Sequence, residues 1–252
     1  MTTTDTRLEA AAAILRDART GPRPADFPAE LIPTSEAEAY RVQDLVLDGG
    51  AVAGWKILAT ATPETFTCAP LPAADELANG GVLVLGDRAP EIEVEIAIRL
   101  VADLPARAGG YDAASVLPAL GTAHVAFEIV ESRFLDRKRV GPLSGLADSQ
   151  SSRGVAIGAK GVEGWRDLPL AELPIRLIGD GAETARARGG ATAEQVVAAL
   201  VWLANHAPTR GPGLRAGQVV ITGARIGPIP ILATKRLVAE IDGIGSVALD
   251  LA

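Results

Sequence analysis

Three glutamates alternate with apolar residues in the stretch Glu91-Ile-Glu-Val-Glu-Ile, where the sequence is richest in potential chemistry. Successive side chains of an extended strand point to opposite faces, so Glu91, Glu93 and Glu95 share one face and the apolar residues share the other. Glutamate is a poor strand former, and like charges on one strand face repel each other. Such a face needs either open water with ion pairs or a bound cation.

A further carboxylate follows in Val125-Ala-Phe-Glu-Ile-Val, where Glu128 stands among apolar residues. An ionised carboxylate is costly in such surroundings unless it is paired. Glu93, Glu95 and Glu128 are therefore candidate ligands of one divalent metal. Mg²⁺ or Mn²⁺ suits them, because these ions take oxygen ligands and keep positions open for water or substrate. The same residues also allow an alternative, a solvated edge strand with surface salt bridges.

The composition argues against several other kinds of site and partner. Two histidines exclude a multi-histidine metal site, and the single cysteine, Cys68, excludes an internal disulfide or a thiolate cluster. The net charge of −7 and the scattered Lys and Arg residues argue against a nucleic-acid partner and an anionic membrane surface. No apolar run is long enough to cross a bilayer, and the amino terminus lacks the pattern of a secretory signal. We expect a cytoplasmic protein with no membrane segment.

The apolar spacing also predicts the elements that position these glutamates. Helical spacing predicts helices at 8–18 and 35–47, the second with a capping box formed by Ser35 and Glu38. Two further helical stretches are expected at 113–119 and 193–205. Runs typical of strands occupy 52–58, 81–85, 91–100, 124–134, 153–159, 173–179, 218–223 and 238–251. We expect one functional unit, with a small helical cap at 1–50 and a β-rich core with outer helices at 51–252.

Several segments, in their order and spacing, resemble the hydratase and decarboxylase branch of the fumarylacetoacetate hydrolase superfamily. They are EAEAYRVQ (36–43), GWKI (54–57), IEVEIA (92–97), AFEIVESR (126–133), LADS (146–149), VWLANH (201–206), LRAGQVVITG (214–223) and GIGSVALDL (243–251). The resemblance spans nearly the whole chain. It implies an α+β fold with a β-rich mixed barrel or roll as its core, outer helices and a small N-terminal helical cap.

The resemblance also implies roles for individual residues. The E-x-E pair and the later glutamate of such enzymes hold the metal, which carries over to Glu93, Glu95 and Glu128. The lysine of the G-x-K-I segment, here Lys56, is implied to be a catalytic residue near the substrate carboxylate and the reacting carbon. Four further positions are implied to bind substrate: Asp148, Ser151, Thr222 and Gly223.

Two departures from the family pattern concern the substrate end of the site. Ser149 replaces an expected asparagine. The 60–75 loop lacks the acidic residue common in hydratases of this branch, and Thr65 or Thr67 stands roughly in its place. These departures leave the expected fold and metal site intact, but they bear on the step in which water is added.

The implied function is that of a metal-dependent lyase, a homo-oligomer acting on a small 2-oxo acid. It would hydrate a 2-hydroxy-dienoate or 2-oxo-enoate to a 4-hydroxy-2-oxo acid. The alternatives are decarboxylation of a 4-oxalocrotonate-like acid, C–C hydrolysis, tautomerisation and non-catalytic binding of a 2-oxo acid. Decarboxylation would need a cation for a second carboxylate, and Arg133 and Arg225 are the two candidates.

Overall fold

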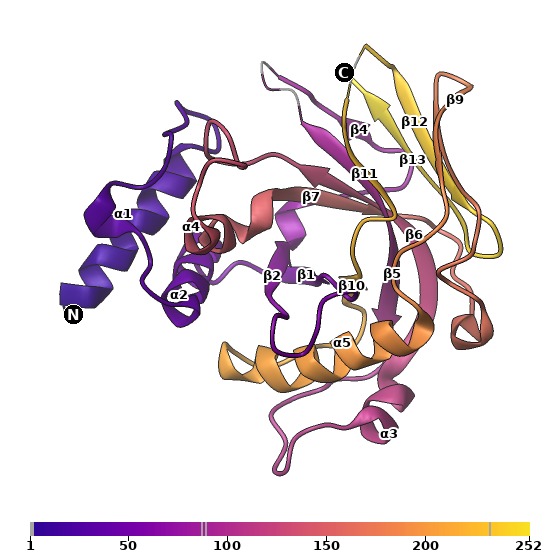
Figure 1. Cartoon of the computed structure of the whole chain (residues 1–252), viewed down its shortest axis with the longest axis horizontal. Helices are drawn as coiled ribbons and strands as arrows, with labels where there is room; N and C mark the ends of the chain where they lie inside the picture. Colours follow the sequence, from indigo (N-terminus) through magenta and orange to yellow (C-terminus); the bar gives the residue numbers. More distant parts are fainter. Residues whose placement is uncertain (1–2, 87, 89, 232) are drawn as a thin grey trace.

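Two β-sheets and their covering helices enclose a hydrophobic core in the computed structural model, which describes residues 3–86, 88, 90–231 and 233–252 (Figure 1). The helices are α1 (Thr3–Asp17), α2 (Glu36–Leu47), α3 (Ala113–Val116), α4 (Pro142–Ala147) and α5 (Ala193–His206). Helices α1 and α2 lie together at one end of the molecule, and α5 runs beneath the strands (Figure 1). The expected α+β fold with outer helices is confirmed. The division into a cap at 1–50 and a core at 51–252 stays a prediction.

The larger sheet has the strand order β2-β1-β10-β5-β6-β7-β3, and β11 also pairs with β5. Its strands are β1 (Val52–Ile57), β2 (Cys68–Pro72), β3 (Glu76–Leu77), β5 (Glu91–Leu100), β6 (Leu120–Val130), β7 (Ser152–Ile157), β10 (Val219–Ile221) and β11 (Ile226–Pro230). The parallel pairing of β1 with β10 and the antiparallel pairing of β10 with β5 place β1 close to the glutamate strand.

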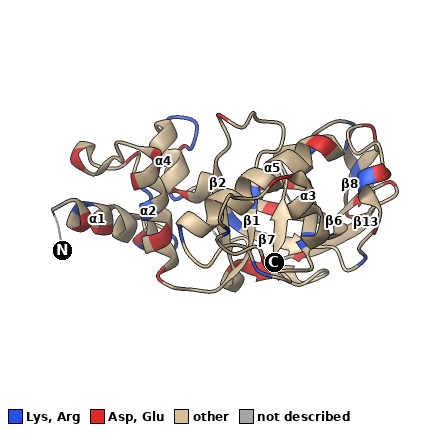
Figure 2. Ribbon diagram, turned by 90° about the horizontal axis from the view of Figure 1, so that it is seen from below, with Lys and Arg blue, Asp and Glu red and all other residues tan. Residues whose placement is uncertain are grey.

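The smaller sheet has the order β4-β13-β12-β8-β9. Its strands are β4 (Val82–Leu83), β8 (Ile175–Gly179), β9 (Ala182–Ala187), β12 (Arg236–Ile241) and β13 (Gly245–Leu251). The two sheets give the mixed, barrel-like architecture expected from the sequence. No described helix is long and apolar enough to cross a membrane. Lys and Arg are interspersed with Asp and Glu along the molecule (Figure 2).

The glutamate strand β5 owes its place to its apolar face. Ile92, Val94 and Ile96 are at most 1% exposed and belong to the main core, so burial of this face fixes which side of the strand the glutamates occupy. The expected alternation along β5 is confirmed. Strand β6 pairs with β5 over most of its length, with Glu128 directly opposite Glu93.

The predicted start of α2 is correct, but only half of the expected capping box forms. The Ser35 hydroxyl accepts a hydrogen bond from the Glu38 amide at 3.3 Å, as a helix cap requires. The Glu38 carboxylate does not return to Ser35. It accepts from the amide and hydroxyl of Thr34 at 2.7 and 3.0 Å and pairs with Arg7 at 2.5 Å. The Glu38 carboxylate thus binds Arg7 of α1 and Thr34 instead of the Ser35 amide.

Candidate active site

The three candidate ligands converge. Glu93 and Glu95 come from β5 and Glu128 from β6, and one oxygen from each carboxylate lies within 4.8 Å of the others. Glu95 and Glu128 are only 2% and 0% exposed. Like charges placed directly opposite each other on adjacent strands destabilise a sheet, so Glu93 and Glu128 need a compensating charge.

The electrostatics of this cluster favour the binding of a cation. Burial, reinforced by the neighbouring Glu128 carboxylate, raises the pKa of Glu93 to about 7. The same two causes raise the pKa of Glu95 well above its ordinary value. One buried oxygen of Glu128, Oε2, has no hydrogen-bond partner. Three carboxylates, one of which has an unpaired buried oxygen, fit a hard divalent ion, which takes oxygen ligands.

Lys56 provides one positive charge in this cluster. Its ammonium group donates to Glu128 Oε1 at 2.6 Å, and its side chain is 13% exposed. Burial lowers the pKa of Lys56, but Glu128 and the other two glutamates outweigh this effect, so the pKa lies above its ordinary value. The structure therefore brings Lys56 to the three glutamates in its charged form.

Gly223 orients one of the candidate ligands. Its amide donates to Glu95 Oε2 at 2.6 Å. The backbone there has a φ of +105°, and a Cβ atom at this position would lie 2.9 Å from Leu58 Cδ1, so a glycine is required. The neighbouring Thr222 is buried, and its hydroxyl donates to the Ile96 carbonyl at 2.8 Å. This hydrogen bond links the backbone turn at Thr222 and Gly223 to β5.

Asp148 is buried in an ion pair with Arg133. It also accepts hydrogen bonds from the Ser132 hydroxyl at 2.7 Å and from the Arg133 amide at 3.2 Å. Burial raises the pKa of Asp148, although Arg133 opposes the shift. The carboxylate is thus occupied by protein groups, an arrangement that holds the following turn in place.

That turn contains three consecutive left-handed residues, Ser149, Gln150 and Ser151, with φ of 49°, 52° and 66°. Such conformations are unfavourable for residues other than glycine and persist where the surroundings enforce them. The Ser151 amide closes the turn by donating to the Asp148 carbonyl at 2.9 Å. The turn places the predicted Ser151 beside Gln150, one residue from the Lys56 contact described next.

Gln150 is a site residue that the sequence analysis missed. Its backbone carbonyl accepts from Lys56 Nζ at 3.4 Å, and its side-chain amide donates to the Thr67 hydroxyl at 2.9 Å. Its side-chain oxygen is buried without a partner. The polar run after Asp148 was the one available signal, because the residue type alone does not reveal a left-handed backbone.

The two threonines considered for the 60–75 loop differ in position. Thr67 contacts Gln150 and so reaches the site. The Thr65 hydroxyl instead bonds within its own loop, to the carbonyl of Thr62 at 3.2 Å. The loop thus presents a hydroxyl, rather than a carboxylate, to the turn beside Lys56.

The two candidate cations for a second substrate carboxylate both bind protein groups. Arg133 pairs with Asp148. Arg225 is buried and donates to the carbonyls of Leu170, Gly189 and Ala191 at 2.7–2.8 Å. Another cation near the cluster, Arg137, pairs with Glu91 at 2.8 Å. Glu91 is therefore paired with Arg137 and does not belong to the group of three converging carboxylates.

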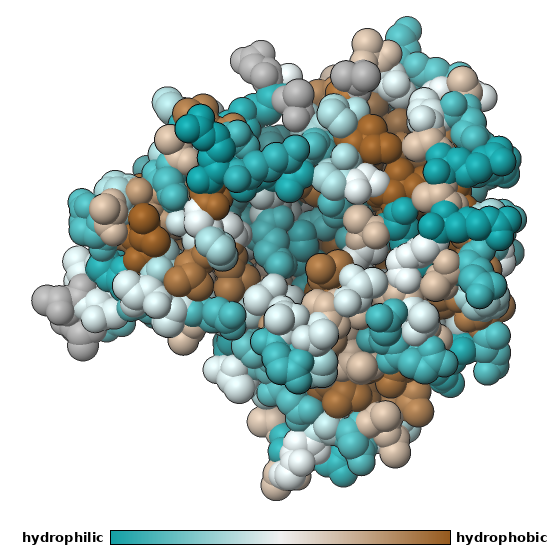
Figure 3. All heavy atoms as spheres, viewed as in Figure 1, coloured by the Kyte–Doolittle hydropathy of each residue, from teal (hydrophilic) through white to brown (hydrophobic). Residues whose placement is uncertain are grey.

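The space-filling view shows a hollow with hydrophilic residues near the centre of one face (Figure 3). It lies between the end of the molecule that carries α1 and α2 and the region of the strands (Figure 1).

Comparisons with known proteins identify the family. No family model matches the chain. A 2-keto-4-pentenoate hydratase of Paraburkholderia phymatum is 31% identical over 259 residues, which span 96% of this chain and 97% of the relative. A protein of the same name from Burkholderia vietnamiensis is 36% identical over 159 residues, spanning 63% of this chain but only 59% of that protein.

Solved structures agree on the fold. The 4-oxalocrotonate decarboxylase of Pseudomonas putida G7, complexed with magnesium and adipate, superposes with a TM-score of 0.81 at 21% identity, covering 100% of this chain and 99% of that one. The fold, the near full-length match to the Paraburkholderia phymatum hydratase and the converging glutamates lead to one assignment. The chain belongs to the fumarylacetoacetate hydrolase superfamily, in its branch of hydratases and decarboxylases.

Proposed function

We propose that this protein is a divalent-metal-dependent lyase that adds water to a 2-hydroxy-dienoate or 2-oxo-enoate, giving a 4-hydroxy-2-oxo acid. The observation that carries the proposal is the ion pair of Lys56 with Glu128 inside the cluster of three glutamates. Relatives named 2-keto-4-pentenoate hydratase and 2-hydroxyhexa-2,4-dienoate hydratase support a small unsaturated 2-oxo acid as the substrate.

Glu93, Glu95 and Glu128 would hold the metal, for which we propose Mg²⁺ or Mn²⁺. When bound, such an ion supplies a Lewis acid that stabilises negative charge developing on the substrate oxygens. The Gly223 amide keeps the Glu95 carboxylate in place at 2.6 Å, so one ligand is oriented in advance.

We assign proton transfer to Lys56. In the net reaction carbon 3 and carbon 5 of the dienol each gain a proton, and the hydroxyl group of one water adds at carbon 4. The two protons are balanced by the one that this water releases and by the one that the 2-hydroxyl group loses as it becomes the 2-oxo group. The ammonium group of Lys56 lies beside the candidate metal ligands, where a positioned acid or base could exchange a proton with the substrate. The Gln150 carbonyl helps to aim this group.

The remaining predicted site residues receive proposed roles of different kinds. Gly223 orients Glu95, and Thr222 fixes the turn before it. Asp148 holds the left-handed turn that carries Gln150 and Ser151 beside Lys56. We also propose that the protein is cytoplasmic and forms a homo-oligomer.

Decarboxylation is the second candidate, because a solved decarboxylase shares the fold. Hydration is favoured by the state of Arg133, Arg225 and Arg137, each of which already binds acidic or carbonyl groups of the protein. A second substrate carboxylate would have to break one of these arrangements to gain a guanidinium partner.

The test measures Mg²⁺-dependent turnover of 2-hydroxypenta-2,4-dienoate and of 4-oxalocrotonate, with hydroxy-acid product and CO₂ followed separately. The proposal expects hydroxy acid from the first substrate and loss of turnover in EDTA, reversed by added Mg²⁺. Rapid CO₂ release from the second substrate without hydration of the first would establish the decarboxylase instead. Binding of both substrates with turnover of neither would indicate a non-catalytic protein.

A further inference from the structure

Leu58 is a large apolar residue that stays half exposed directly after β1. It is 50% exposed, whereas Trp55 and Ile57 are only 7% and 2% exposed. Successive residues of an extended strand point to opposite faces, so Leu58 shares the face of Lys56. On that face Lys56 reaches Glu128. Leu58 therefore lies on the side of the sheet that carries the cluster of three glutamates.

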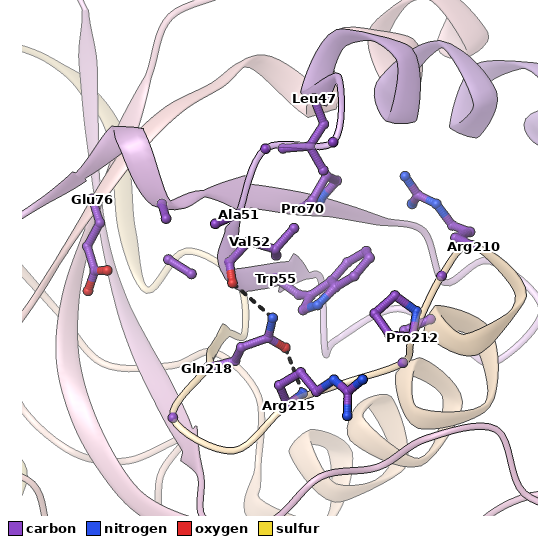
Figure 4. Close-up of a pocket in the computed structure, with 18 of the residues that line it drawn as sticks. Leu47, Ala51, Val52, Trp55, Pro70, Glu76, Arg210, Pro212, Arg215 and Gln218 are labelled. Atoms are coloured by element: carbon purple, nitrogen blue, oxygen red, sulfur yellow. Dashed lines mark hydrogen bonds between the residues drawn. The ribbon is translucent and has the colours of Figure 1, made fainter.

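The opposite face of β1 is already covered by other parts of the chain. Trp55 and Ile57 belong to the main hydrophobic core. Trp55 also lines a separate pocket, together with Pro70 and Pro212 (Figure 4). Leu58 takes no part in this core or this pocket, although it is as apolar as its buried neighbours.

The register of three neighbouring strands brings Leu58 toward Glu95. Lys56 of β1 lies beside Ile221 of β10, and Ile221 lies beside Ala97 of β5. The first pairing is parallel and the second is antiparallel. A step of two residues along this register leads forward from Lys56 to Leu58 and backward from Ala97 to Glu95. Only the turn that follows β10 stands between these two side chains.

Backbone contacts hold that turn between the two strands. The Ala59 amide donates to the Thr222 carbonyl at 3.1 Å, and the Thr222 amide donates to a carbonyl of β5 at 3.2 Å. The Gly223 amide donates to Glu95 at 2.6 Å, and a Cβ atom on Gly223 would lie 2.9 Å from Leu58 Cδ1. Because glycine has no side chain, the leucine packs directly on the turn that holds a candidate metal ligand.

We propose that Leu58 is a specificity-determining residue, which contacts the apolar carbon chain of the substrate. This inference rests on the binding of a 2-oxo acid at the metal site, which the proposed function includes. A hydrocarbon chain that covers Leu58 removes apolar surface from water, which favours binding. A charged group in the same place would lose water without gaining a partner. The site therefore prefers 2-oxo acids with an alkyl chain to pyruvate and to dicarboxylic acids.

The experiment measures binding as well as turnover. The full chain is titrated calorimetrically at saturating Mg²⁺ with pyruvate, 2-oxobutanoate and 2-oxopentanoate, which share the 2-oxo acid end and differ by one methylene group each. Leu58→Ala removes the apolar contact, and Leu58→Met keeps it. The control is Val101→Ala, because Val101 is 60% exposed and lies about 20 Å along β5 from Glu95. Titration with Mg²⁺ alone checks the metal site of each variant.

In the wild-type protein we expect each added methylene group to tighten binding about two- to fourfold, because full burial of such a group contributes about fourfold. Leu58→Ala should remove most of this gain, with the affinities for pyruvate and Mg²⁺ changed less than about twofold. Leu58→Met and Val101→Ala should keep the gain. In Leu58→Ala the ratio of kcat/KM for 2-hydroxyhexa-2,4-dienoate to that for 2-hydroxypenta-2,4-dienoate should fall by about the same factor.

The outcomes separate this inference from the hydratase proposal. Affinity that is independent of chain length, or a dependence that persists in Leu58→Ala, would overturn the role of Leu58 alone. Failure of every 2-oxo acid to bind in the presence of Mg²⁺ would overturn both proposals. Affinity that follows chain length and is lost in Leu58→Ala, without turnover of either dienoate, would support the role of Leu58 and overturn only the hydratase activity.

Discussion

Replacement of Lys56 by methionine separates its chemical role from its structural one. Methionine keeps an unbranched apolar stem but has no ammonium group. If Lys56 transfers protons, turnover should fall by about two to four orders of magnitude, the usual contribution of a positioned acid or base. Metal affinity should not weaken, because Lys56 Nζ is bound to Glu128 Oε1 at 2.6 Å and is a cation that competes for this carboxylate.

The same change should destabilise the metal-free protein. Glu128 is 0% exposed, and removal of one partner of a buried ion pair costs about 3–5 kcal/mol. Thermal unfolding in EDTA should therefore show a lowered melting temperature, which Mg²⁺ restores by neutralising the unpaired charge of Glu128. The matched control is Lys235→Met, because Lys235 is exposed and lies just before β12 of the smaller sheet.

Steady-state kinetics, calorimetric titration with Mg²⁺ and melting curves, measured on both variants, provide the test. Unchanged turnover in Lys56→Met would remove this residue from the mechanism. Loss of metal binding together with turnover would assign Lys56 a purely structural role and refute the reasoning from the ion pair.

Three further predictions concern the groups around the cluster. Gly223→Ala should weaken Mg²⁺ binding about tenfold in calorimetric titration, because the new Cβ atom displaces the turn whose amide fixes Glu95, whereas the exposed Gly181→Ala should not affect it. Asp148→Asn should cost about 3 kcal/mol in urea unfolding, because buried Arg133 loses its charge partner; an unchanged midpoint would contradict the role of this pair. The raised pKa values of Glu93 and Glu95 mean that the folded metal-free protein holds protons that the unfolded chain releases, so this cluster loses stability as pH rises from about 4.5 through 7. The gain in melting temperature on adding Mg²⁺ should accordingly be larger at pH 8 than at pH 5.5, and a gain independent of pH would show that these carboxylates do not bind the ion.

The sequence predicted the central part of the site because that part depends on strand periodicity. Alternation along 91–96 placed Glu93 and Glu95 on one face, and the apolar surroundings of Glu128 marked it as needing a partner. The register that puts Glu128 opposite Glu93 follows from burial of both apolar strand faces, which a single-residue slip would reverse.

Elements with weak periodicity were missed. Strand β9 reads AETARA and is mostly exposed, so no alternation of apolar residues marks it. Strand β2 contains two prolines, which are typical of a loop, although its first four residues are buried and it pairs with β1. The pairing of these strands depends on contacts with other strands. The spacing of apolar residues within the segment itself does not reveal such contacts.

The partners of the polar side chains were also beyond sequence reasoning. Arg133 and Arg225 looked equally able to reach a substrate, but each binds groups that are distant in the sequence, such as Asp148, 15 residues from Arg133, and Leu170, 55 residues from Arg225. The left-handed backbone of Gln150 is imposed in the same way, by the packing around the turn.

The run of left-handed residues at 149–151 has a consequence for the evolvability of this enzyme. Each such residue lowers the stability of the folded protein by of order 1 kcal/mol relative to glycine. The geometry of this turn is therefore kept at a cost in folding stability. Replacement of Ser149 by glycine would recover part of that stability without altering Lys56 or the carboxylates. Variants that start from such a background would tolerate more destabilising changes elsewhere in the pocket, which makes this turn a natural starting point for directed evolution toward new substrates.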